Sequence, residues 1–410
     1  MYFIYNLLIS LYGRIVKLVA LFNPKAKLWV DGRKNVLESI AENINSNDKP
    51  IWFHAASLGE FEQGRPIIEE VKNKYPNKKI LLTFYSPSGY EVRKDYEGAD
   101  WIYYLPLDTK SKSDKFIELV NPSMAIFIKY EFWPNIINSL YKAKVNTIVI
   151  SAIFREDQVF FKSYGGWMRK SLSKFSKFFV QDDNSVKLLN SIGITQVDKS
   201  GDTRFDRVMD ILKNDNTVDF VKEFKGTYNL LVAGSTWPED DEMLLEYINN
   251  TEIETKVLIA PHNISKEYNK KLKERIKVKT VLFSEIEGKN LIDYDVLILD
   301  TVGLLTKVYS YADVAYVGGG FGKEGIHNIL EPAVFSIPVI TGPIFDKFRE
   351  AVELNELKGM IVSKNTEEFL TYMDRFVFGE KTKAGQIAFN YIKENSGAQE
   401  KILEYISDNI

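Results

Sequence analysis

Short runs of β-branched and aromatic residues alternate with longer amphipathic stretches along most of the chain. In the first half these runs cover residues 51–53, 80–84, 101–105, 124–128, 147–150 and 178–180. Strands that alternate with helices in this way build a parallel sheet covered by helices. After the polar residues 213–227 the rhythm restarts, with runs at 230–233, 257–259, 281–283, 296–299, 314–317 and 339–341. The pattern therefore predicts an α/β fold with two doubly wound domains.

The polar stretch also places the domain boundaries. We predict an N-terminal domain over residues 23–205, a linker over 206–226 and a C-terminal domain over 227–410, whose last stretch, 383–410, is helical. Ligands of open α/β sheets bind beyond the carboxyl ends of the strands. We expect the two domains to face each other across a cleft, which is then the default place for the active site.

Residues 1–22 form a separate predicted element. A membrane-spanning helix here would bury two cations, Arg14 and Lys17. These cations continue a stripe of polar or small residues at helical spacing that begins with Asn6, Ser10 and Gly13, and apolar residues fill the rest. This pattern is typical of a helix that lies in a membrane interface with its cations toward the headgroups. A helix packed on the protein's own surface is the alternative, and the lack of a small-residue cleavage site disfavours a signal peptide.

Composition narrows the functional classes. With 410 residues and 45% hydrophobic content, the chain is long enough for two domains that each have a core. A net charge of −3 gives no overall electrostatic footprint for nucleic acid, which is therefore not an expected partner. Cysteine is absent, so disulfides, thiolate nucleophiles and cysteine metal sites are excluded, and a reducing cytoplasm is permitted.

The sequence HAASLGEFEQGRP, residues 54–66, places Glu60 where a buried strand gives way to a helix. In an α/β sheet this junction is where ligands bind, so Glu60 is a candidate reagent. The position also suits an ordinary acid, because negative charge is favoured near a helix N-terminus. Sequence position alone leaves both roles open.

A glycine cluster follows a strand of the predicted C-terminal domain, in YVGGGFGKEGIHNILEPAVFSIPVITGP at residues 316–343. Gly318, Gly319 and Gly320 let the backbone approach a ligand closely. A helix expected to open at residues 325–328 offers unpaired N–H groups to a phosphate. A structural need of the backbone is the alternative explanation for these glycines.

Two polar residues follow the glycines. Glu331 comes about one helical turn after Asn328, where its carboxylate can accept hydrogen bonds from ribose hydroxyls. The sequence 320–325 formally matches the dinucleotide pattern G-x-G-x-x-G, but no acid stands at the ribose position after the next strand. The cluster thus indicates a phosphate or nucleotide site without the dehydrogenase fingerprint.

Two further strand ends of the same domain carry polar residues. Ser235 and Thr236 precede Pro238 and three acids, which suits both helix capping and a polar ligand wall. His262 follows another strand, where a neutral imidazole can bind a phosphate oxygen or a sugar hydroxyl, or act as a structural hydrogen bonder. Ligand-binding and structural roles are both open for these three residues.

Taken together, the motifs resemble those of the bacterial 3-deoxy-D-manno-octulosonic acid (Kdo) transferases, which act on the lipid A precursor. HAASLGEFEQGRP, TFYSPSGYE, YLPLD, KYEFWPN, GDTRFD, GSTWPEDDE, APH and GGGFGKEGIHNILEPAVFSIPVITGP occur in the family's order, over about residues 50–345. The resemblance implies a GT-B fold, with two Rossmann-like doubly wound domains facing a cleft, the acceptor lipid on the N-terminal domain and CMP-Kdo on the C-terminal one. It also implies a Gram-negative protein at the cytoplasmic face of the inner membrane, peripheral or monotopic, which agrees with the predicted amphipathic helix.

The resemblance implies an inverting transfer of Kdo from CMP-Kdo to the lipid A precursor, in lipopolysaccharide biosynthesis. Glu60 is then the general base that takes the proton of the attacking hydroxyl, and Glu131 is the second catalytic residue. The predicted donor-binding residues are Ser235, Thr236, His262, Gly318, Gly319, Gly320, Asn328 and Glu331, and the predicted acceptor-binding residues are Ser57, Gly59, Arg65, Lys129, Arg155 and Lys162. Because the glycine loop and its helix can stabilise departing CMP by fixed dipoles, we expect no metal and no cofactor besides the donor substrate.

Two positions depart from the family pattern. Family members often have two acids before Trp-Pro-Asn, whereas this chain has Lys129 in place of the first and keeps Glu131. After His262, residues 263–266 replace the family's usual Pro and Arg. These departures leave the role of the first acid and the phosphate contact near His262 open.

Three alternative functions remain at this level. Another GT-B enzyme that uses a nucleotide sugar, as a transferase or an epimerase, would also use the glycine loop and Glu331, but the N-terminal motifs argue against it. The missing ribose-binding acid argues against a nicotinamide-dependent dehydrogenase. The joint presence of Glu60, His262, Asn328 and Glu331 argues against a catalytically inactive membrane-associated binding protein.

Overall fold

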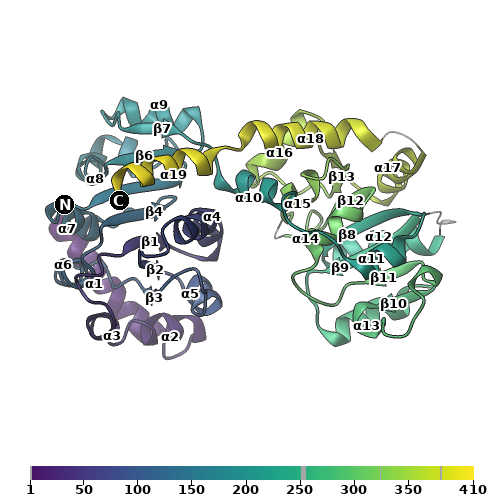
Figure 1. The fold of residues 1–410 in the computed structure, drawn as a ribbon, viewed down its shortest axis with the longest axis horizontal. Helices are drawn as coiled ribbons and strands as arrows, with labels where there is room; N and C mark the ends of the chain where they lie inside the picture. Colours follow the sequence, from purple (N-terminus) through teal and green to yellow (C-terminus); the bar gives the residue numbers. More distant parts are fainter. Residues whose placement is uncertain (1, 251–254, 324, 379–380) are drawn as a thin grey trace. The chain divides into compact units, whose positions relative to one another are not determined.

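The computed structural model describes residues 2–250, 255–323, 325–378 and 381–410, which fold into two compact units (Figure 1). Unit 1 extends to Asp206 and includes Ser396–Ile410, and unit 2 is Arg207–Asn395. Within the described residues, each unit contains one parallel sheet of seven strands. The prediction of two doubly wound α/β domains is therefore confirmed.

The strands of unit 1 have the order β3-β2-β1-β4-β5-β6-β7, so the order reverses between β1 and β4. The strands are β1 (Ile51–Ala55), β2 (Ile80–Phe84), β3 (Trp101–Tyr104), β4 (Met124–Ile128), β5 (Asn146–Ala152), β6 (Lys177–Val180) and β7 (Val197–Lys199). The helices are α1 (Tyr2–Val19), α2 (Pro24–Asp31), α3 (Val36–Asn43), α4 (Leu58–Lys74), α5 (Pro87–Arg93), α6 (Lys110–Val120), α7 (Pro134–Lys142), α8 (Gly166–Leu172), α9 (Asp183–Ser191), α10 (Thr203–Ile211) and α19 (Ala398–Asn409), and 3-10 turns cover Val159–Phe161 and Ser163–Gly165.

Unit 2 has the order β10-β11-β9-β8-β12-β13-β14, which reverses between β8 and β12. Its strands are β8 (Asn229–Thr236), β9 (Thr255–Pro261), β10 (Thr280–Leu282), β11 (Val296–Ile298), β12 (Val314–Val317), β13 (Val339–Thr341) and β14 (Ile361–Val362). Its helices are α11 (Asp219–Lys225), α12 (Pro238–Asn250), α13 (Lys266–Arg275), α14 (Leu305–Val308), α15 (Leu330–Ala333), α16 (Arg349–Glu356), α17 (Thr366–Phe378) and α18 (Lys381–Asn395), and 3-10 turns cover Phe283–Glu285, Leu291–Asp293 and Tyr309–Tyr311.

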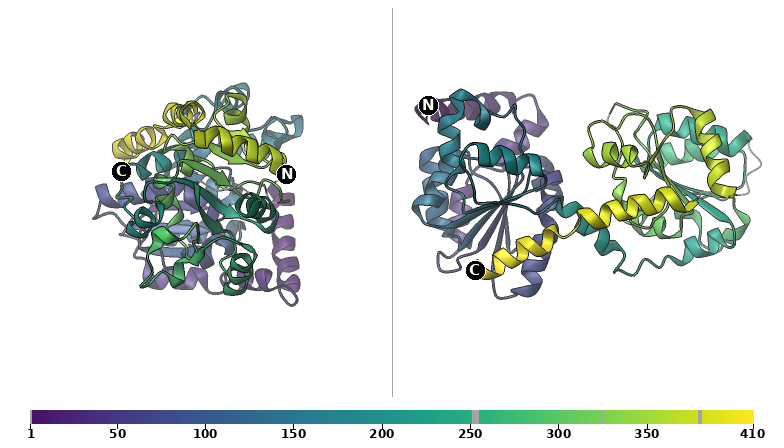
Figure 2. Two further views of the ribbon diagram at one scale, coloured as in Figure 1. Left: turned by 90° about the vertical axis from the view of Figure 1, so that its right-hand side faces the viewer. Right: turned by 90° about the horizontal axis from the view of Figure 1, so that it is seen from above.

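Each sheet separates two hydrophobic cores, with helices on both faces (Figure 2). Successive side chains of a strand point to opposite faces of its sheet. In β1, Trp52 belongs to one core, whereas Ile51 and Phe53 belong to the other. Strands that are buried on both faces read as continuous apolar runs, and for this reason the sequence located them. All twelve predicted strands are present, and the two that were missed, β7 and β14, are very short.

The C-terminal stretch differs from the prediction of one helical segment in the C-terminal domain. The helical stretch is interrupted between α18 and α19 at Gly397, which has a φ of 102° in the left-handed region that favours glycine. The carboxylate of Asp206 accepts hydrogen bonds of 2.7 and 3.1 Å from the backbone N–H groups of Gly397 and Ala398, at the start of α19. Ile402 and Ile406 of α19 are fully buried in the core of unit 1. The last helix therefore belongs to unit 1 (Figure 1).

The predicted linker over residues 206–226 is also corrected. The units divide between Asp206 and Arg207, within α10. Most of the predicted linker belongs to unit 2, where Val221 and Phe224 of α11 are buried in the core. The stretch is polar because α11 exposes its charged side chains Asp219, Lys222 and Glu223, and polarity alone does not distinguish such a helix from a linker.

The N-terminal helix α1 packs on unit 1 through its polar side. Tyr5 donates a hydrogen bond of 2.6 Å from its hydroxyl to Asp108, and Asn6 accepts one of 3.0 Å from Asn135. Gly13 is buried, and a Cβ there would lie 2.6 Å from Leu107 Cδ2. The exposed side of α1 and of the turn after it is apolar, with Phe3, Ile4, Leu7, Leu8, Leu11, Ile15, Leu18, Leu21 and Phe22 each at least 47% exposed. Part of the predicted polar stripe therefore docks on the protein, and the apolar residues face outward.

Judged by length and composition alone, one helix of the described chain could cross a membrane, and this helix is α1. A signal sequence or a buried helix meets the same criterion. Only 6% of this segment is buried in the structure, so it is not a core helix. A large exposed apolar surface of this kind typically marks a site of contact with another protein or with a membrane.

Candidate active site

The first candidate residues lie where β1 gives way to α4. Ser57 immediately precedes α4, and its hydroxyl donates a hydrogen bond to the carboxylate of Glu60, which is partly exposed. Gly59 is exposed, and a Cβ there would lie 3.9 Å from Ser57 Oγ, an ordinary contact distance. By contrast, a Cβ at Gly64 of the same helix would lie 2.2 Å from Ile128 Cδ1. Packing requires glycine at position 64 but not at 59, so Gly59 leaves open space beside Glu60.

Glu131 follows β4, the strand adjacent to β1. Its Oε2 accepts a hydrogen bond of 2.9 Å from Nε1 of Trp133 and lies 3.5 Å from Nε2 of His54. His54 is fully buried in β1, and its Nδ1 lies 2.9 Å from the hydroxyl oxygen of Thr83. The same Nδ1 lies 3.1 Å from the carbonyl oxygen of Thr83, so this ring nitrogen has both a hydroxyl and a carbonyl neighbour. Glu131 is thus held by two aromatic side chains at the point where the strand order reverses, which is where such sheets bind ligands.

Tyr130 connects the charged groups of this region. Burial raises the pKa of its hydroxyl, and the negative charges of Glu60 and Glu131 raise that pKa further, whereas the positive charge of Arg155 opposes them. The two predicted catalytic carboxylates and one predicted acceptor-binding cation therefore act on the same hydroxyl. Tyr130 lies in the motif KYEFWPN, but no role for it was predicted from the sequence. The signal was its position between Lys129 and Glu131, directly after a buried strand.

Lys129 adopts the left-handed conformation, with a φ of 66°. Its ammonium lies 5.7 Å from the centre of the Tyr130 ring. A non-glycine residue with positive φ next to a strand end is uncommon and is often found at functional sites. The conformation turns the chain directly after β4, so Glu131 follows on the same side as the end of β1.

Two predicted acceptor-binding residues are arranged differently from the expectation. Arg65 donates a hydrogen bond of 2.7 Å to Glu69 and lies 3.9 Å from Glu62, both on α4, and among the described contacts it has none with Glu60. Lys162 lies between two 3-10 turns, where its carbonyl oxygen accepts a hydrogen bond of 3.0 Å from Arg169. The structure groups Arg155 with Glu60 through Tyr130 but gives no such link for Arg65 or Lys162.

The segment GDTRFD holds α4 in position. The side-chain amide of Gln63 on α4 donates a hydrogen bond of 3.1 Å to Asp202, and the hydroxyl of Thr203 donates to the carbonyl oxygen of Gln63. Asp202 also accepts a hydrogen bond of 2.9 Å from Nε of Arg204. Asp202 and Thr203 are buried, so these bonds fix the start of α4, and with it Glu60, against α10.

In unit 2, Asp240 organises the loop that contains the glycine cluster. Its carboxylate, fully buried, accepts hydrogen bonds of 2.8 Å from the backbone N–H of Trp237, 2.8 Å from that of Gly319 and 2.5 Å from the hydroxyl of Tyr316. Burial raises the pKa of Asp240, and these donors partly offset that rise. A carboxylate of α12 thus ties the end of β8 to the end of β12. The sequence left helix capping and a polar ligand wall open for this acid, and it did not indicate the link to Gly319.

The three glycines each have a steric reason. A Cβ at Gly318 would lie 2.5 Å from the carbonyl oxygen of Ser235, and one at Gly320 would lie 2.6 Å from the Cα of Gly342. Gly319 has a φ of 94°, and a Cβ there would lie 2.3 Å from the carbonyl oxygen of Gly325. The structural explanation for these glycines therefore holds, whether or not a ligand also binds beside them.

The glycine N–H groups are mostly used within the protein. Gly318 N–H donates to the carbonyl oxygen of Gly234 at 3.0 Å, and Gly319 N–H donates to Asp240. These two N–H groups therefore have partners within the protein. Ser235, the residue after Gly234 in β8, has a φ of 55° and is partly exposed, and Thr236 is buried.

Three aromatic rings stack at the carboxyl ends of β8, β9 and β12. The rings of Trp237 and His262 have centroids 4.4 Å apart and are nearly parallel, and His262 lies 4.6 Å from His327. Nε1 of Trp237 donates a hydrogen bond of 3.0 Å to Nε2 of His327, which must therefore be unprotonated. Burial and the charge of His262 lower the pKa of His327, in agreement with a neutral ring. His262 itself is exposed, so one face of this stack borders solvent.

The helix expected to open at residues 325–328 does not form there. The short helix α15 begins at Leu330, and Asn328 precedes it, accepting a hydrogen bond of 3.1 Å from Leu330 N–H. Residues 325–328 have no regular secondary structure, and His327 N–H donates a hydrogen bond to the carbonyl oxygen of Gly318, directly after β12. Glu324 of the G-x-G-x-x-G match lies outside the described residues.

Asn328 and Glu331 are brought together as expected from their spacing. The side-chain amide of Asn328 donates a hydrogen bond of 3.0 Å to Glu331 Oε1, and the hydroxyl of Thr306 donates one of 2.8 Å to Oε2. Each carboxylate oxygen can accept more than one hydrogen bond. Glu331 is partly exposed, so its carboxylate remains able to accept hydroxyl groups of a ligand.

Among the described residues, no group of three or more His, Asp or Glu side chains is arranged to hold a metal ion. Proton transfer at Glu60 and polar contacts to a nucleotide in unit 2 are the two operations that the geometry supports.

Comparisons with known proteins cover most of the chain. Residues 32–207 match a family model described as 3-deoxy-D-manno-octulosonic-acid transferase (kdotransferase). The chain is 30% identical to a 3-deoxy-D-manno-octulosonic acid transferase of Aquifex aeolicus over 348 residues, which cover 83% of this chain and 89% of the relative. A protein of that name from Haemophilus influenzae is 26% identical over 87% of this chain and 86% of its own length.

Two solved structures show the fold. A UDP-GlcNAc 2-epimerase from Neisseria meningitidis aligns with a TM-score of 0.58 at 13% identity, over 88% of this chain and 100% of that chain. MurG from Acinetobacter baumannii aligns with a TM-score of 0.52 at 10% identity, over 88% and 99%. These similarities confirm the predicted GT-B class, with its two Rossmann-like domains. At this level of identity they concern the fold and not the function.

Proposed function

Because this chain belongs to the family of 3-deoxy-D-manno-octulosonic acid transferases and is a glycosyltransferase, we propose that it moves Kdo from CMP-Kdo to the lipid A precursor. The observation that carries the proposal is the position of Glu60. Its carboxylate stands at the point of unit 1 where the strand order reverses, is oriented by Ser57 and has open space beside it at Gly59.

The proposed reaction is a single displacement that inverts the anomeric carbon of Kdo. A hydroxyl oxygen of the acceptor forms a bond to that carbon while the bond from the carbon to the phosphate oxygen of CMP breaks. The hydroxyl proton passes to Glu60, and CMP leaves with the electron pair of the broken bond. The Ser57 hydroxyl, which donates to Glu60, fixes the direction of the carboxylate so that a free oxygen lone pair can point at the acceptor.

Glu131 has a supporting role in this proposal. Its contacts with Trp133 and His54 hold a negative charge near Tyr130 and Glu60. This charge acts on the same Tyr130 hydroxyl as the charge of Glu60, so Glu131 belongs to the electrostatic surroundings of the proposed base. We assign the acceptor to this end of unit 1, with Lys129 and Arg155 as the cations closest to these carboxylates.

We assign the donor nucleotide to the carboxyl end of the unit 2 sheet. Ser235, Thr236 and the exposed ring of His262 lie at the ends of β8 and β9, and Glu331 offers a carboxylate for ribose hydroxyls. The neutral, hydrogen-bonded state of His327 keeps the Trp237–His262–His327 stack in one orientation. No step of this proposal passes through a metal ion.

We further propose that the protein is held at the cytoplasmic face of the inner membrane by α1, lying in the plane of the interface. The exposed apolar side of α1 supports this placement, since an unpartnered apolar helix face is stabilised by entering the acyl boundary. The acceptor's acyl chains would then stay in the bilayer while its sugars reach unit 1.

The test is mass spectrometry of the lipid after incubation of the purified protein with CMP-Kdo and the tetraacyl lipid A precursor. We expect the precursor mass to increase by one or more Kdo residues. UDP-N-acetylglucosamine, given in place of CMP-Kdo, distinguishes the nucleotide-sugar transferase or epimerase alternative. A conversion of UDP-N-acetylglucosamine with no change in the lipid mass under CMP-Kdo would contradict the proposal.

A further inference from the structure

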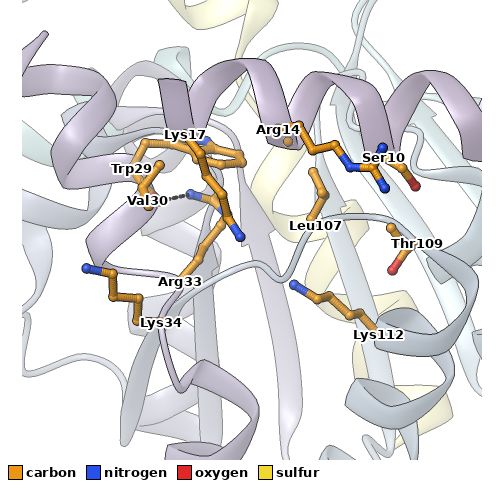
Figure 3. A pocket seen from close by; sticks show the side chains of 11 residues that line it. Ser10, Arg14, Lys17, Trp29, Val30, Arg33, Lys34, Leu107, Thr109 and Lys112 are labelled. Atoms are coloured by element: carbon orange, nitrogen blue, oxygen red, sulfur yellow. Dashed lines mark hydrogen bonds between the residues drawn. The ribbon is translucent and has the colours of Figure 1, made fainter. Parts of the chain in front are cut away.

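A pocket of about 350 Å³ lies beneath α1 in unit 1, away from the residues proposed for catalysis. Its walls come from α1, from α2 with the turn after it, and from the segment that joins β3 to α6. Figure 3 shows Lys17 of α1 and Lys112 of α6 reaching toward one another across it, with Arg33 between them and α2. Gly13 forms part of its roof, where α1 passes close to Leu107.

Five of the eleven residues that line this pocket are basic, and the other six are apolar or uncharged. Arg14, Lys17, Arg33, Lys34 and Lys112 contribute to its lining, and no acidic residue does so among the described residues. Lys34 is 2.6 Å from Asp31, which it shares with Lys27. Arg14, Lys17 and Lys112 have no carboxylate within ion-pair distance in the described chain. At least three positive charges therefore converge without a counterion from the protein.

Arg33 adds a fourth charge that the fold has fixed in place. Its guanidinium donates hydrogen bonds to the carbonyl oxygens of Trp29, Tyr85 and Leu105, and it lies 3.9 Å from the centre of the Trp29 ring. Burial lowers the pKa of Arg33 to about 10, which leaves the group charged at neutral pH. All of these partners are neutral, so the positive charge is oriented but not neutralised.

The nearest buried carboxylate does not supply the missing charge. Asp108, next to Leu107 in sequence, accepts hydrogen bonds from Tyr5, Ser113, and the backbone N–H groups of Asn135 and Ile136. It is fully buried and is not part of the pocket lining. The pocket thus keeps an excess of positive charge while the carboxylate behind it is satisfied by neutral donors.

The pocket opens beside the exposed apolar side of α1. The exposed leucines Leu7, Leu11 and Leu18 lie on the same helix as Arg14 and Lys17. The helix α1 could therefore contact a phosphate in the pocket and, through these leucines, the acyl chains attached to it. Cations beside a membrane-facing apolar helix match the charge of anionic headgroups. Neither feature alone identifies the ligand, but an anionic headgroup with attached acyl chains satisfies both.

We propose that this basic pocket binds the phosphate of an anionic membrane phospholipid while the apolar side of α1 enters the acyl layer. The proposal rests on the membrane association proposed above and adds a headgroup site to it. The site is separate from the acceptor site, although the two are linked: Tyr85, whose carbonyl holds Arg33, stacks at 4.5 Å on Trp133, which donates to Glu131. A lipid bound in the pocket would therefore hold the Glu131 end of unit 1 close to the membrane.

The experiment measures binding of the full chain to vesicles of phosphatidylcholine and to vesicles of equal parts phosphatidylcholine and phosphatidylglycerol. We compare the wild type with a Lys17→Ala/Lys112→Ala double variant. The control is Lys78→Ala/Lys187→Ala, which removes the same charge from unit 1 outside the pocket. Kdo transfer is measured separately, in detergent micelles, for all three proteins.

We expect the double variant to bind the phosphatidylglycerol vesicles about thirtyfold more weakly, because a basic residue near an anionic surface typically contributes a few-fold to affinity, and to bind phosphatidylcholine vesicles like the wild type. The control variant should retain most of the wild-type affinity, and kcat/KM in detergent should be unchanged in both variants. Unchanged affinity of the double variant, or an equal loss in the control, would overturn the proposal.

A raised KM for the lipid acceptor in detergent, with vesicle binding unchanged, would assign the pocket to the acceptor and would equally overturn the proposal. A wild-type protein that binds phosphatidylglycerol vesicles through Lys17 and Lys112 but transfers no Kdo would sink the proposed function and leave the headgroup site standing. The two failures are thereby distinguished.

Discussion

The buried carboxylate of Asp240 accepts a hydrogen bond from the backbone N–H of Gly319, at 2.8 Å. The bond joins the first turn of α12 to the glycine loop after β12, so the loop is shaped by a side chain from another element. A donor nucleotide would therefore meet a loop whose conformation is set before it binds.

Replacing Asp240 with Asn tests this relationship. The Asn side chain has the same size as Asp. Its N–H₂ group would face one of the groups that donate a hydrogen bond to Asp240, so that bond would be lost. We expect the free energy of unfolding to fall by roughly 1.5–3 kcal/mol, the usual contribution of hydrogen bonds to a charged group, and CMP affinity to fall with it. Urea unfolding and calorimetry measure both. Glu239→Gln, at the exposed neighbouring acid, is the control, and a more stable Asn variant would show that burial of the charge outweighs its bonds.

Asp241 gives a pH dependence of stability. Burial is the largest cause that raises the pKa of this carboxyl, to about 6, and the charge of Asp240 adds to the rise, while Tyr268 and Arg275 oppose it. Because the folded-state pKa lies above the unfolded value, this group's stabilising contribution is full below the unfolded pKa and is lost as the pH rises toward and through about 6.

Asp241→Asn removes that titration. We expect the stability of the wild type relative to the Asn variant to decrease between about pH 4 and pH 7, by roughly 3 kcal/mol at most, since one pKa unit corresponds to about 1.36 kcal/mol. Thermal unfolding at a series of pH values measures it. A stability difference that does not change with pH would show that the carboxyl titrates normally.

Glu60→Gln tests the proposed base. The amide keeps the size of the side chain and cannot take a proton, so we expect turnover to fall by about 10²-fold or more, with folding and CMP binding retained. Glu62→Gln, two residues along α4 and paired with Arg93 at 2.7 Å, serves as the matched control and should stay active. A Glu60→Gln variant that melts far earlier yet is fully active per folded molecule would make Glu60 a structural residue.

Glu331→Ala tests the donor assignment. The substitution removes the carboxylate that Thr306 and Asn328 orient, and we expect CMP-Kdo to bind far more weakly while the lipid acceptor binds as before. Thr306→Val, which removes only one orienting bond, should produce a smaller loss in the same direction. Calorimetry with CMP measures the CMP affinity of both variants. Unchanged CMP binding by the Ala variant would remove Glu331 from the site.

The apolar side of α1 is tested at Leu8, which is 56% exposed. Leu8→Asp places a charge in the acyl boundary, so we expect much of the protein to move to the soluble fraction of cells. Leu357→Asp, at a leucine of unit 2 with 52% exposure, should leave the distribution unchanged. We also expect high-pH carbonate to extract the intact protein. Resistance to carbonate together with labelling of residue 2 from the periplasmic side would show that α1 spans the membrane.

The sequence predicted twelve strands of the two sheets because most of them are buried on both faces and therefore appear as unbroken apolar runs. It did not predict β7, whose three residues Val197–Lys199 are mostly polar and exposed at the sheet edge. The sequence also did not predict which side of α1 packs on the protein. The polar stripe indicated which residues share a face, but Tyr5 and Asn6 bond to residues more than a hundred positions away, and no local pattern records such partners.

The candidate site was predicted in part for the same reason. Local motifs singled out Glu60, Glu331 and His262, because each directly follows a strand or opens a helix. The partners that hold them come from other strands: Trp237 and His327 pack with His262 only once β8, β9 and β12 are side by side. Arg65 is an acceptor-binding prediction of the same kind, and its partners in the structure are Glu69 and Glu62 of α4, which a motif does not reveal.

The return of α19 to unit 1 has a consequence for synthesis of the protein. Ile402 and Ile406 complete the core that surrounds Ile51 and Phe179, yet they follow the whole of unit 2 in the sequence. Unit 1 therefore cannot close its core until unit 2 has been translated, in contrast to the usual order in which an N-terminal domain folds first. A chain that ends before Ala398 would leave this apolar surface of unit 1 exposed. We expect quality-control proteases to recognise such a chain through unit 1, although the missing residues follow unit 2 in the sequence.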